Sequence, residues 1–182
     1  MTIRDWLEGL SYKLVQGSLD VEVNEVVYDS RKAAPGAVFV CMKGTKIDSH
    51  DFVGQVTDAG VKVLVTEHAV EAPADVTVVE TANGREALAL LSAARFGYPS
   101  RKLTMIGVTG TKGKTTTTHM IKTILETAGK KTGMIGTNGV YIGEEHFPTV
   151  NTTPESYDLH RYFAKMVEEG CACCVMEVSS QA

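Results

Sequence analysis

A glycine- and threonine-rich turn between an apolar strand and an amphipathic helix constrains this chain more than any other feature. Residues 103–110 (LTMIGVTG) are mostly apolar, residues 110–116 are GTKGKTT, and the periodicity of residues 114–131 predicts a helix. The backbone N–H groups of such a turn form a nest for an anion, and the helix N-terminus adds partial positive charge. The turn therefore predicts a phosphate site in an α/β sheet.

The residue types in the turn suit a nucleotide triphosphate. Glycines 110 and 113 permit positive φ. Lys114 is placed to meet the β- and γ-phosphates, and the Thr115 hydroxyl to ligate Mg²⁺. Val108 stands where the strict G-x-x-x-x-G-K-[ST] pattern has glycine, so a plain glycine-rich turn with an exposed lysine is the alternative. With ATP and Mg²⁺ as expected cofactors, the predicted cofactor-binding residues are Gly110, Thr111, Lys112, Gly113, Lys114, Thr115 and Thr116.

An acidic residue at the end of an apolar strand is the second signal. Residues 171–178 (CACCVMEV) are apolar apart from Glu177. A buried carboxylate is costly unless it serves a cation or a hydrogen-bond network. In a parallel sheet its neighbour could be the strand before the turn, which would bring it near Mg²⁺. We predict Lys114 and Glu177 as catalytic residues and Thr115 and Glu177 as metal ligands; a solvated glutamate at a fraying strand end is the alternative.

A third signal is the polar triplet Asn151, Thr152 and Thr153. It precedes a helix predicted over 154–170, with Pro154 at its first position. Its polar groups would lie at a helix N-terminus suited to a ligand anion. Simple capping would account for one of the three residues but does not require all of them.

The chain has an α/β pattern throughout, in which apolar runs alternate with amphipathic stretches. We predict a small N-terminal α/β domain over 1–98 and, after the break YPSRK, the first part of a P-loop domain with a parallel sheet over 99–182. Because the chain stops directly after a strand, we expect the second domain to be incomplete. The predicted strands are 23–30, 37–42, 61–66, 76–81, 103–110, 132–137 and 171–178, the hairpin is 140–150, and the helices are 51–60, 83–97, 114–131 and 154–170.

Composition excludes several classes of protein. With 43% hydrophobic residues the chain is not expected to be disordered, and a net charge of −4 argues against a nucleic-acid binder. No apolar run approaches the roughly 18 residues of a membrane span. The four cysteines are too few and too clustered for a disulfide scaffold, so Cys171 and Cys174 are predicted to be buried free thiols. The five histidines show no metal-ligand spacing. We expect a cytoplasmic protein without a membrane partner.

Together these motifs resemble the Mur ligase family, whose own ATP loop also lacks the first glycine of the strict pattern. The segments DSR (29–31), PGAVFVCMKGTKIDSHDF (35–52), NTTPES (151–156) and MEVSSQA (176–182) resemble its MurE-type branch. That branch makes an amide bond in peptidoglycan synthesis. It uses ATP, through an acyl phosphate, to add L-lysine or meso-diaminopimelate to UDP-N-acetylmuramoyl-L-alanyl-D-glutamate.

The resemblance implies that residues 1–98 hold the UDP end of the substrate and that residues 99–182 begin the ATPase domain of a monomer. Its carbamylated lysine and the domain that selects the amino acid would follow residue 182. We therefore expect this chain alone to bind the UDP-substrate weakly and to form no amide. Carried over by position, the substrate-binding residues are Tyr28, Ser30, Thr45, Lys46, Ile47, Asn151, Thr152, Thr153 and Ser179.

Three other functions stay open at this point. A ligase resembling folylpolyglutamate synthase shares the ATP loop, but it does not predict a first domain that binds UDP. A P-loop regulatory NTPase would hydrolyse ATP independently of a UDP-sugar. A nucleotide-sugar-binding module with a vestigial loop would bind its ligand equally well after the substitution Lys114→Ala.

Overall fold

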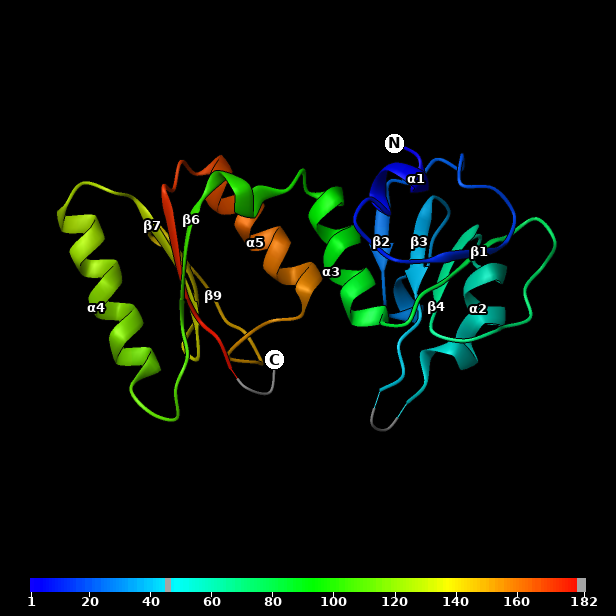
Figure 1. The fold of residues 1–182 in the computed structure, drawn as a ribbon. Coiled ribbons are helices and arrows are strands. Elements are labelled where there is room, and N and C mark those ends of the chain that lie inside the picture. Colours follow the sequence, from blue (N-terminus) through cyan, green and yellow to red (C-terminus); the bar gives the residue numbers. More distant parts are fainter. Residues whose placement is uncertain (45–46, 180–182) are drawn as a thin grey trace. The chain divides into compact units, whose positions relative to one another are not determined.

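The computed structural model describes residues 1–44 and 47–179, and the chain divides into two compact units, Met1–Arg95 and Phe96–Ala182. Each unit is built on a sheet of five strands with helices packed on it (Figure 1). This architecture confirms the predicted α/β fold class. Among the described residues, no helix combines the length and the apolar character needed to cross a membrane.

In the first unit the strand order is β1-β5-β4-β3-β2, with β2 to β5 parallel and β1 antiparallel to β5. The α1 helix and the β1 strand were not predicted. Leu14 and Val15, both in β1, are 40% and 48% exposed, so the strand has no alternation of buried and exposed positions. The elements are α1 (Ile3–Trp6), β1 (Lys13–Gln16), β2 (Glu25–Val27), η1 (Ser30–Lys32), β3 (Ala37–Val40), η2 (Ser49–Phe52), α2 (Val53–Asp58), β4 (Val63–Thr66), β5 (Thr77–Glu80) and α3 (Gly84–Arg95).

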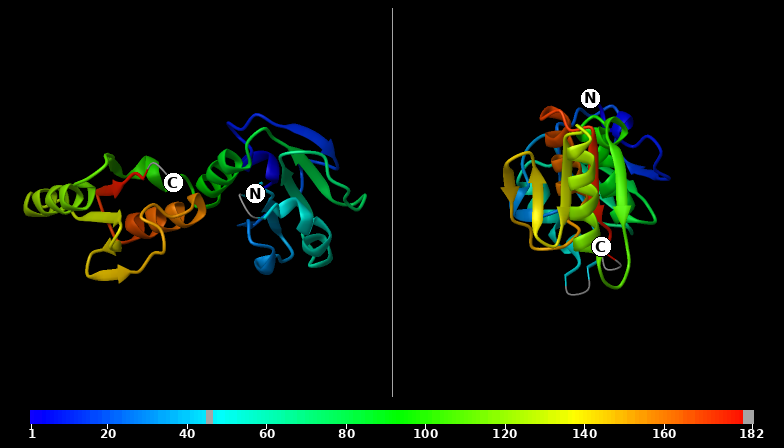
Figure 2. Two further views of the ribbon diagram at one scale, coloured as in Figure 1. Left: turned by 90° about the horizontal axis from the view of Figure 1, so that it is seen from below. Right: turned by 90° about the vertical axis from the view of Figure 1, so that its left-hand side faces the viewer.

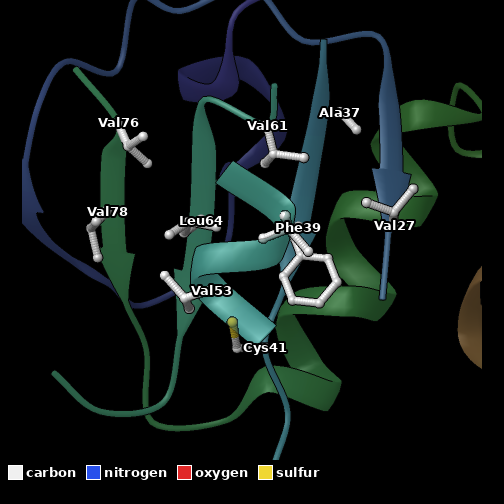
Figure 3. Packing of buried hydrophobic residues seen from close by; sticks show 10 residues of the cluster. Val27, Ala37, Phe39, Cys41, Val53, Val61, Leu64, Val76 and Val78 are labelled. Carbon is white, nitrogen blue, oxygen red and sulfur yellow. The ribbon is translucent and has the colours of Figure 1, made fainter. Parts of the chain in front are cut away.

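Helices cover both faces of this sheet. On one face Val53 of α2 packs in a cluster with Phe39 and Leu64 from the central strands (Figure 3). The α3 helix lies on the opposite side (Figure 1) and buries Leu88 and Leu91. Since both faces are covered, β3 and β4 are buried at every position, which explains why they are continuous apolar runs in the sequence.

In the second unit the order is β6-β10-β7-β8-β9, with β6, β10 and β7 parallel. The antiparallel pair of β8 and β9 confirms the predicted hairpin, and it makes the sheet mixed. The α4 helix lies along one face (Figure 2), and α5 covers the other (Figure 1). The elements are η3 (Pro99–Lys102), β6 (Thr104–Val108), α4 (Lys114–Thr127), β7 (Thr132–Gly136), β8 (Gly139–Ile142), β9 (Glu145–Phe147), α5 (Ser156–Glu168) and β10 (Cys173–Glu177).

The apolar side chains of α4 form a stripe at helical spacing, and this stripe is not a single buried face. Met120 and Ile124 are 60% and 64% exposed, whereas Ile121 and Leu125 are half-buried. Thr118 is the fully buried residue of the helix. The helix thus contacts the sheet through one flank of the stripe, and the other flank has no cover among the residues that the structure describes.

The start of α5 also differs from the prediction. The helix begins at Ser156 with Glu155 as its N-cap residue, so Pro154 precedes it. A residue before proline favours extended backbone, and Thr153 is held by hydrogen bonds to β10 and the residues after it instead of capping the helix.

All four cysteines, residues 41, 171, 173 and 174, are buried free thiols, as predicted for Cys171 and Cys174. Burial raises the pKa of the Cys41 and Cys174 thiols to about 12. A thiol with so high a pKa is almost entirely protonated at neutral pH, so these two side chains are unreactive parts of the core.

Candidate nucleotide and metal site

The register of the second sheet brings Glu177 to the glycine-rich turn. In the parallel pair of β10 and β6, Glu177 lies beside Val108, the last residue of β6. Figure 1 shows β6 leading into the turn before α4, with β10 beside it. The predicted pairing of these two strands is confirmed. Ligands of open α/β sheets bind at this carboxyl edge of the strands.

The turn leaves the N-terminus of α4 open. Gly110 and Gly113 have φ values of 147° and 80°, and Gly113 is an N-cap residue without a side-chain hydrogen bond. In α3, by contrast, Glu67 and Asn83 accept hydrogen bonds from the first three backbone N–H groups. The initial N–H groups of a helix need acceptors. Those of α4 receive none from a capping side chain and are suited to an external anion.

Lys114 reaches across the turn. Its Nζ donates a hydrogen bond to the carbonyl oxygen of Gly110 at 2.8 Å. An ammonium group has three donors, so two more remain for an anion held by the turn. Thr111 and Lys112, also predicted cofactor residues, are exposed on the turn.

Thr116, the last predicted cofactor residue, is exposed and faces another surface. It lines a depression of about 380 Å³ together with the apolar side chains of Met120 and Ile124. Neighbouring helix positions point about 100° apart. Thr115, by contrast, is half-buried and reaches Glu177, so only one of these two threonines lies at the carboxylate.

The carboxylate of Glu177 is buried, with 1% of the residue exposed. Its Oε2 accepts hydrogen bonds from the hydroxyls of Thr115 at 3.1 Å and Thr137 at 3.3 Å, and its Oε1 accepts one from the Thr137 N–H at 2.9 Å. These three hydrogen bonds come from neutral groups and offset part of the cost of burying a carboxyl group. The Thr115 hydroxyl donates a hydrogen bond to Glu177, which leaves its oxygen lone pairs for a cation. This donor set fits Mg²⁺, which prefers oxygen ligands.

Two residues of this site were missed in the sequence. A Cβ atom at Gly136 would lie 2.3 Å from Glu177 Oε1, so the carboxylate fits only beside a glycine. Thr137 binds both carboxylate oxygens. A polar residue at the end of the predicted strand 132–137 would have been the signal, because the ends of neighbouring parallel strands meet at one edge.

The predicted substrate triplet lies at the same edge, on the other side of Thr137. The hydroxyls of Thr137 and Thr152 are 3.2 Å apart. Thr153 Oγ1 donates to the Glu177 carbonyl oxygen at 3.0 Å and accepts from the Ser179 N–H at 3.0 Å. The structure thus brings two members of the triplet and Ser179 beside Glu177. The expected place at a helix N-terminus is wrong, because α5 begins only at Ser156.

Asn151, the first member of the triplet, is exposed and precedes the two threonines. It stays a predicted substrate residue because of its position beside them.

In the first unit, Tyr28 and Ser30 follow β2 and are half-buried. Asp29, between them, accepts hydrogen bonds from the Arg31 guanidinium at 2.8 and 2.6 Å. Arg31 lowers the pKa of Asp29 to about 2 through these bonds. The pair fixes the η1 turn in which Ser30 is the first residue.

The second predicted substrate segment of this unit follows β3. Ile47 is 63% exposed, and its carbonyl oxygen accepts a hydrogen bond from the Gly44 N–H at 2.9 Å. Thr45 and Lys46 lie outside the described residues. Because β2 and β3 are parallel neighbours, both predicted segments follow strand ends at the same edge of the sheet.

Two domain families match the chain in succession. Residues 22–96 match the Mur ligase family catalytic domain, and residues 108–182 match the Mur ligase middle domain. The UDP-N-acetylmuramoyl-L-alanyl-D-glutamate–2,6-diaminopimelate ligase of Clostridium perfringens is 45% identical over 182 residues, which cover 100% of this chain and 38% of that protein. The ligase of the same name from Geobacillus thermodenitrificans is 46% identical over 166 residues, 91% of this chain and 33% of that protein. The chain therefore spans well under half the length of these curated relatives.

Solved structures agree in fold. A structure of a UDP-N-acetylmuramoyl-L-alanyl-D-glutamate–2,6-diaminopimelate ligase superposes with a TM-score of 0.78 at 18% identity, over 100% of this chain and 36% of that one. A crystal structure of MurF from Acinetobacter baumannii has a TM-score of 0.65 at 25% identity, over 98% and 36% of the two chains. With two domain matches in succession and relatives above 40% identity over its whole length, the chain belongs to the Mur ligase family.

Proposed function

We propose that the protein carrying this sequence is an ATP-dependent ligase of peptidoglycan precursor synthesis. It joins a diamino acid to UDP-N-acetylmuramoyl-L-alanyl-D-glutamate. The observation that carries this proposal is the uncapped N-terminus of α4 beside the hydrogen bond between Thr115 and the buried Glu177. The names of the relatives at 45% and 46% identity specify 2,6-diaminopimelate. We take this as the diamino acid, with L-lysine as the alternative.

The proposed nucleotide site is the turn 110–116. Its backbone N–H groups and the Lys114 ammonium would hold the phosphates of ATP, and Thr115 and Glu177 would hold Mg²⁺. A magnesium ion bound there would neutralise phosphate charge and fix the orientation of the transferred phosphoryl group. A MurF structure from Thermotoga maritima in complex with ADP, with a TM-score of 0.57 to this chain, has the same fold.

The proposed reaction has two steps. An oxygen of the substrate's D-glutamate carboxylate attacks the γ-phosphorus of ATP, ADP leaves, and an acyl phosphate results. The amine of the diamino acid then attacks the acyl carbon, phosphate leaves, and the nitrogen loses a proton. Carboxylate and phosphate repel one another, so Lys114 acts by lowering that repulsion. Glu177 orients the Thr115 hydroxyl and does not act as a base.

Different segments would hold different parts of the substrate. Residues 1–98, through Tyr28, Ser30 and the segment 45–47, would bind the UDP end. Residues 99–182 would bind ATP. The muramoyl-peptide would be held by Asn151, Thr152, Thr153 and Ser179, of which Thr152 contacts Thr137 and hence the Glu177 network.

We also propose that the protein acts in the cytoplasm. All four of its cysteines are free thiols, which is usual in a reducing compartment. The nucleotide-linked substrate of the proposed reaction and ATP would both be available there.

The test incubates the complete protein with ATP, Mg²⁺, the UDP-linked dipeptide and either diaminopimelate or L-lysine, and measures phosphate release and product mass. We expect one amide product, formed only when all components are present. Phosphate release without the UDP-linked dipeptide would instead favour a regulatory NTPase. Ligation of glutamate to a folate would favour the folylpolyglutamate type of ligase.

A further inference from the structure

A second hydrogen-bond network lies at the carboxyl edge of the first sheet, and its centre is Glu67, directly after β4. One carboxylate oxygen, Oε2, accepts the backbone N–H of Lys43 at 3.0 Å. The other, Oε1, accepts the backbone N–H of Gly84 at 2.8 Å. Glu67 therefore ties the chain leaving β3 to the first residue of α3.

His50 closes the network from the other side. It is 7% exposed, its Nε2 accepts the Glu67 N–H at 2.9 Å, and its Nδ1 lies 2.5 Å from Asp48 Oδ1. Because Nε2 is an acceptor, the proton of the neutral ring must be on Nδ1, which donates to Asp48. This bond lowers the pKa of the Asp48 carboxyl. The ring also stacks on His68, with the centroids 3.9 Å apart.

A metal site does not account for this cluster, although one ligand atom from each of Asp48, His50 and His68 lies within 4.8 Å of the others. Both ring nitrogens of His50 are engaged, one as acceptor and one as donor, so the ring has no free lone pair. Asp48 Oδ2 and His68 Nε2, 3.7 Å apart, remain. Two donors are fewer than a protein metal site uses.

The network instead holds Met42 and Lys43, which follow β3, beside Asp48 and Ser49, and these four residues form a neck. Lys43 is held by Glu67, and Asp48 is held by His50. Ser49 closes the neck, since its hydroxyl pairs with the N–H and the carbonyl oxygen of Met42 at 2.6 and 2.9 Å. Lys43 and Asp48 form an antiparallel bridge across the neck.

We propose that Glu67 and His50 are positioning residues that fix this neck of Met42, Lys43, Asp48 and Ser49 for recognition of the UDP end of the substrate. The inference rests on the proposed function. The neck begins just after β3, at the same sheet edge as Ser30 after β2. Neither residue needs to touch substrate: each acts through the backbone N–H group or side chain that it holds.

The test uses the complete ligase and the substitution Glu67→Gln. An amide has one acceptor oxygen where the carboxylate has two, so one of the two N–H groups loses its partner. Because a hydrogen bond to a charged group is lost, we expect the KM for the UDP-linked dipeptide to rise about tenfold. We expect kcat and the KM for ATP to stay unchanged. The matched control is Glu71→Gln, at an exposed glutamate four residues further along, and it should change neither KM.

A pair of substitutions at His50 gives a second measurement. In His50→Gln the amide can still accept from the Glu67 N–H and donate to Asp48, whereas His50→Leu can do neither. We expect the KM for the UDP-linked dipeptide to rise in the leucine variant and to be largely restored in the glutamine variant.

Two results would overturn the inference while leaving the proposed function intact. One is an unchanged KM for the UDP-linked dipeptide in both Glu67→Gln and His50→Leu. The other is a fall in kcat together with an equal rise in both KM values, which would indicate only general destabilisation. A wild-type protein that forms no amide would instead contradict the proposed function, and the inference with it.

Discussion

The hydroxyl of Thr115 donates a hydrogen bond to Oε2 of Glu177 over 3.1 Å, joining the first turn of α4 to the last residue of β10 across 62 positions of sequence. The parallel pairing of β10 with β6 brings the two residues together. Because the hydroxyl proton is directed at the carboxylate, the oxygen lone pairs are left for a cation. The phosphate-binding turn and the proposed metal site are therefore one unit, and different substitutions should separate their contributions.

The substitution Lys114→Ala should weaken ATP binding with little effect on folding. Loss of a charged hydrogen-bond donor to phosphate corresponds to a decrease in affinity of about ten- to a hundredfold. The side chain is half-buried, and its hydrogen bond to the Gly110 carbonyl oxygen lies within its own turn. We expect the free energy of unfolding without nucleotide to change by less than about 0.5 kcal/mol. Isothermal titration calorimetry measures the affinity, and Lys130→Ala, at an exposed lysine beyond α4, is the control. Equal ATP affinities for the two variants would contradict the assignment.

The substitution Glu177→Gln should reduce the magnesium dependence of ATP binding. The amide has almost the same shape, and the hydroxyls of Thr115 and Thr137 can accept as well as donate, so the local fold should survive. Without Mg²⁺, loss of a negative charge near the phosphates should leave ATP affinity unchanged or raise it. Mg²⁺ raises the affinity of the wild type for ATP, and in the variant this increase should be smaller by at least about tenfold, because a charged metal ligand is lost. Titrations with and without Mg²⁺ test this, and an undiminished gain would exclude Glu177 from the metal site.

The turn and its carboxylate were predictable because their signals are local. Gly113, Lys114 and Thr115 stand between an apolar run and an amphipathic helix, and Glu177 interrupts an apolar strand. Residue type and spacing alone therefore indicate a phosphate site with an acidic neighbour.

The rest of the site depends on strand order, which local patterns do not contain. β10 follows β7, β8 and β9 in the sequence but lies between β6 and β7 in the sheet. Gly136 and Thr137, at the end of β7, therefore contact Glu177. A strand at the sheet edge likewise lacks an alternating pattern, which is why β1 was missed. The exposure of Met120 shows a similar limit: periodicity identifies an apolar flank of a helix but not which part of that flank contacts the sheet.

The substitution Gly136→Ala should damage both stability and the proposed metal site. The added Cβ would lie 2.3 Å from Glu177 Oε1, so either the carboxylate or β7 must move. Overpacking of this kind costs about 1–3 kcal/mol. Gly107→Ala is the matched control, since its Cβ would meet only a methyl group of Val178, at 3.2 Å, in a residue that is 40% exposed. Urea unfolding monitored by circular dichroism should show a larger loss of stability for Gly136→Ala than for Gly107→Ala. Equal stabilities would mean that the carboxylate has room to move.

The pair of Asp29 and Arg31 should contribute to acid stability in a defined pH window. Arg31 lowers the pKa of Asp29 from 3.8 to about 2, so the native state favours the ionised carboxyl. This stabilisation is complete above pH 3.8 and is lost as the pH falls towards 2. In Asp29→Asn the contribution is absent, so the free energy of unfolding should fall less steeply over this window than in the wild type.

The fluorescence of Trp6, the single tryptophan and a buried residue of the first unit, can follow urea unfolding at each pH. Asp51→Asn, at an exposed carboxylate, should keep the wild-type slope. Identical slopes for Asp29→Asn and the wild type would show that the ion pair makes no net contribution to stability.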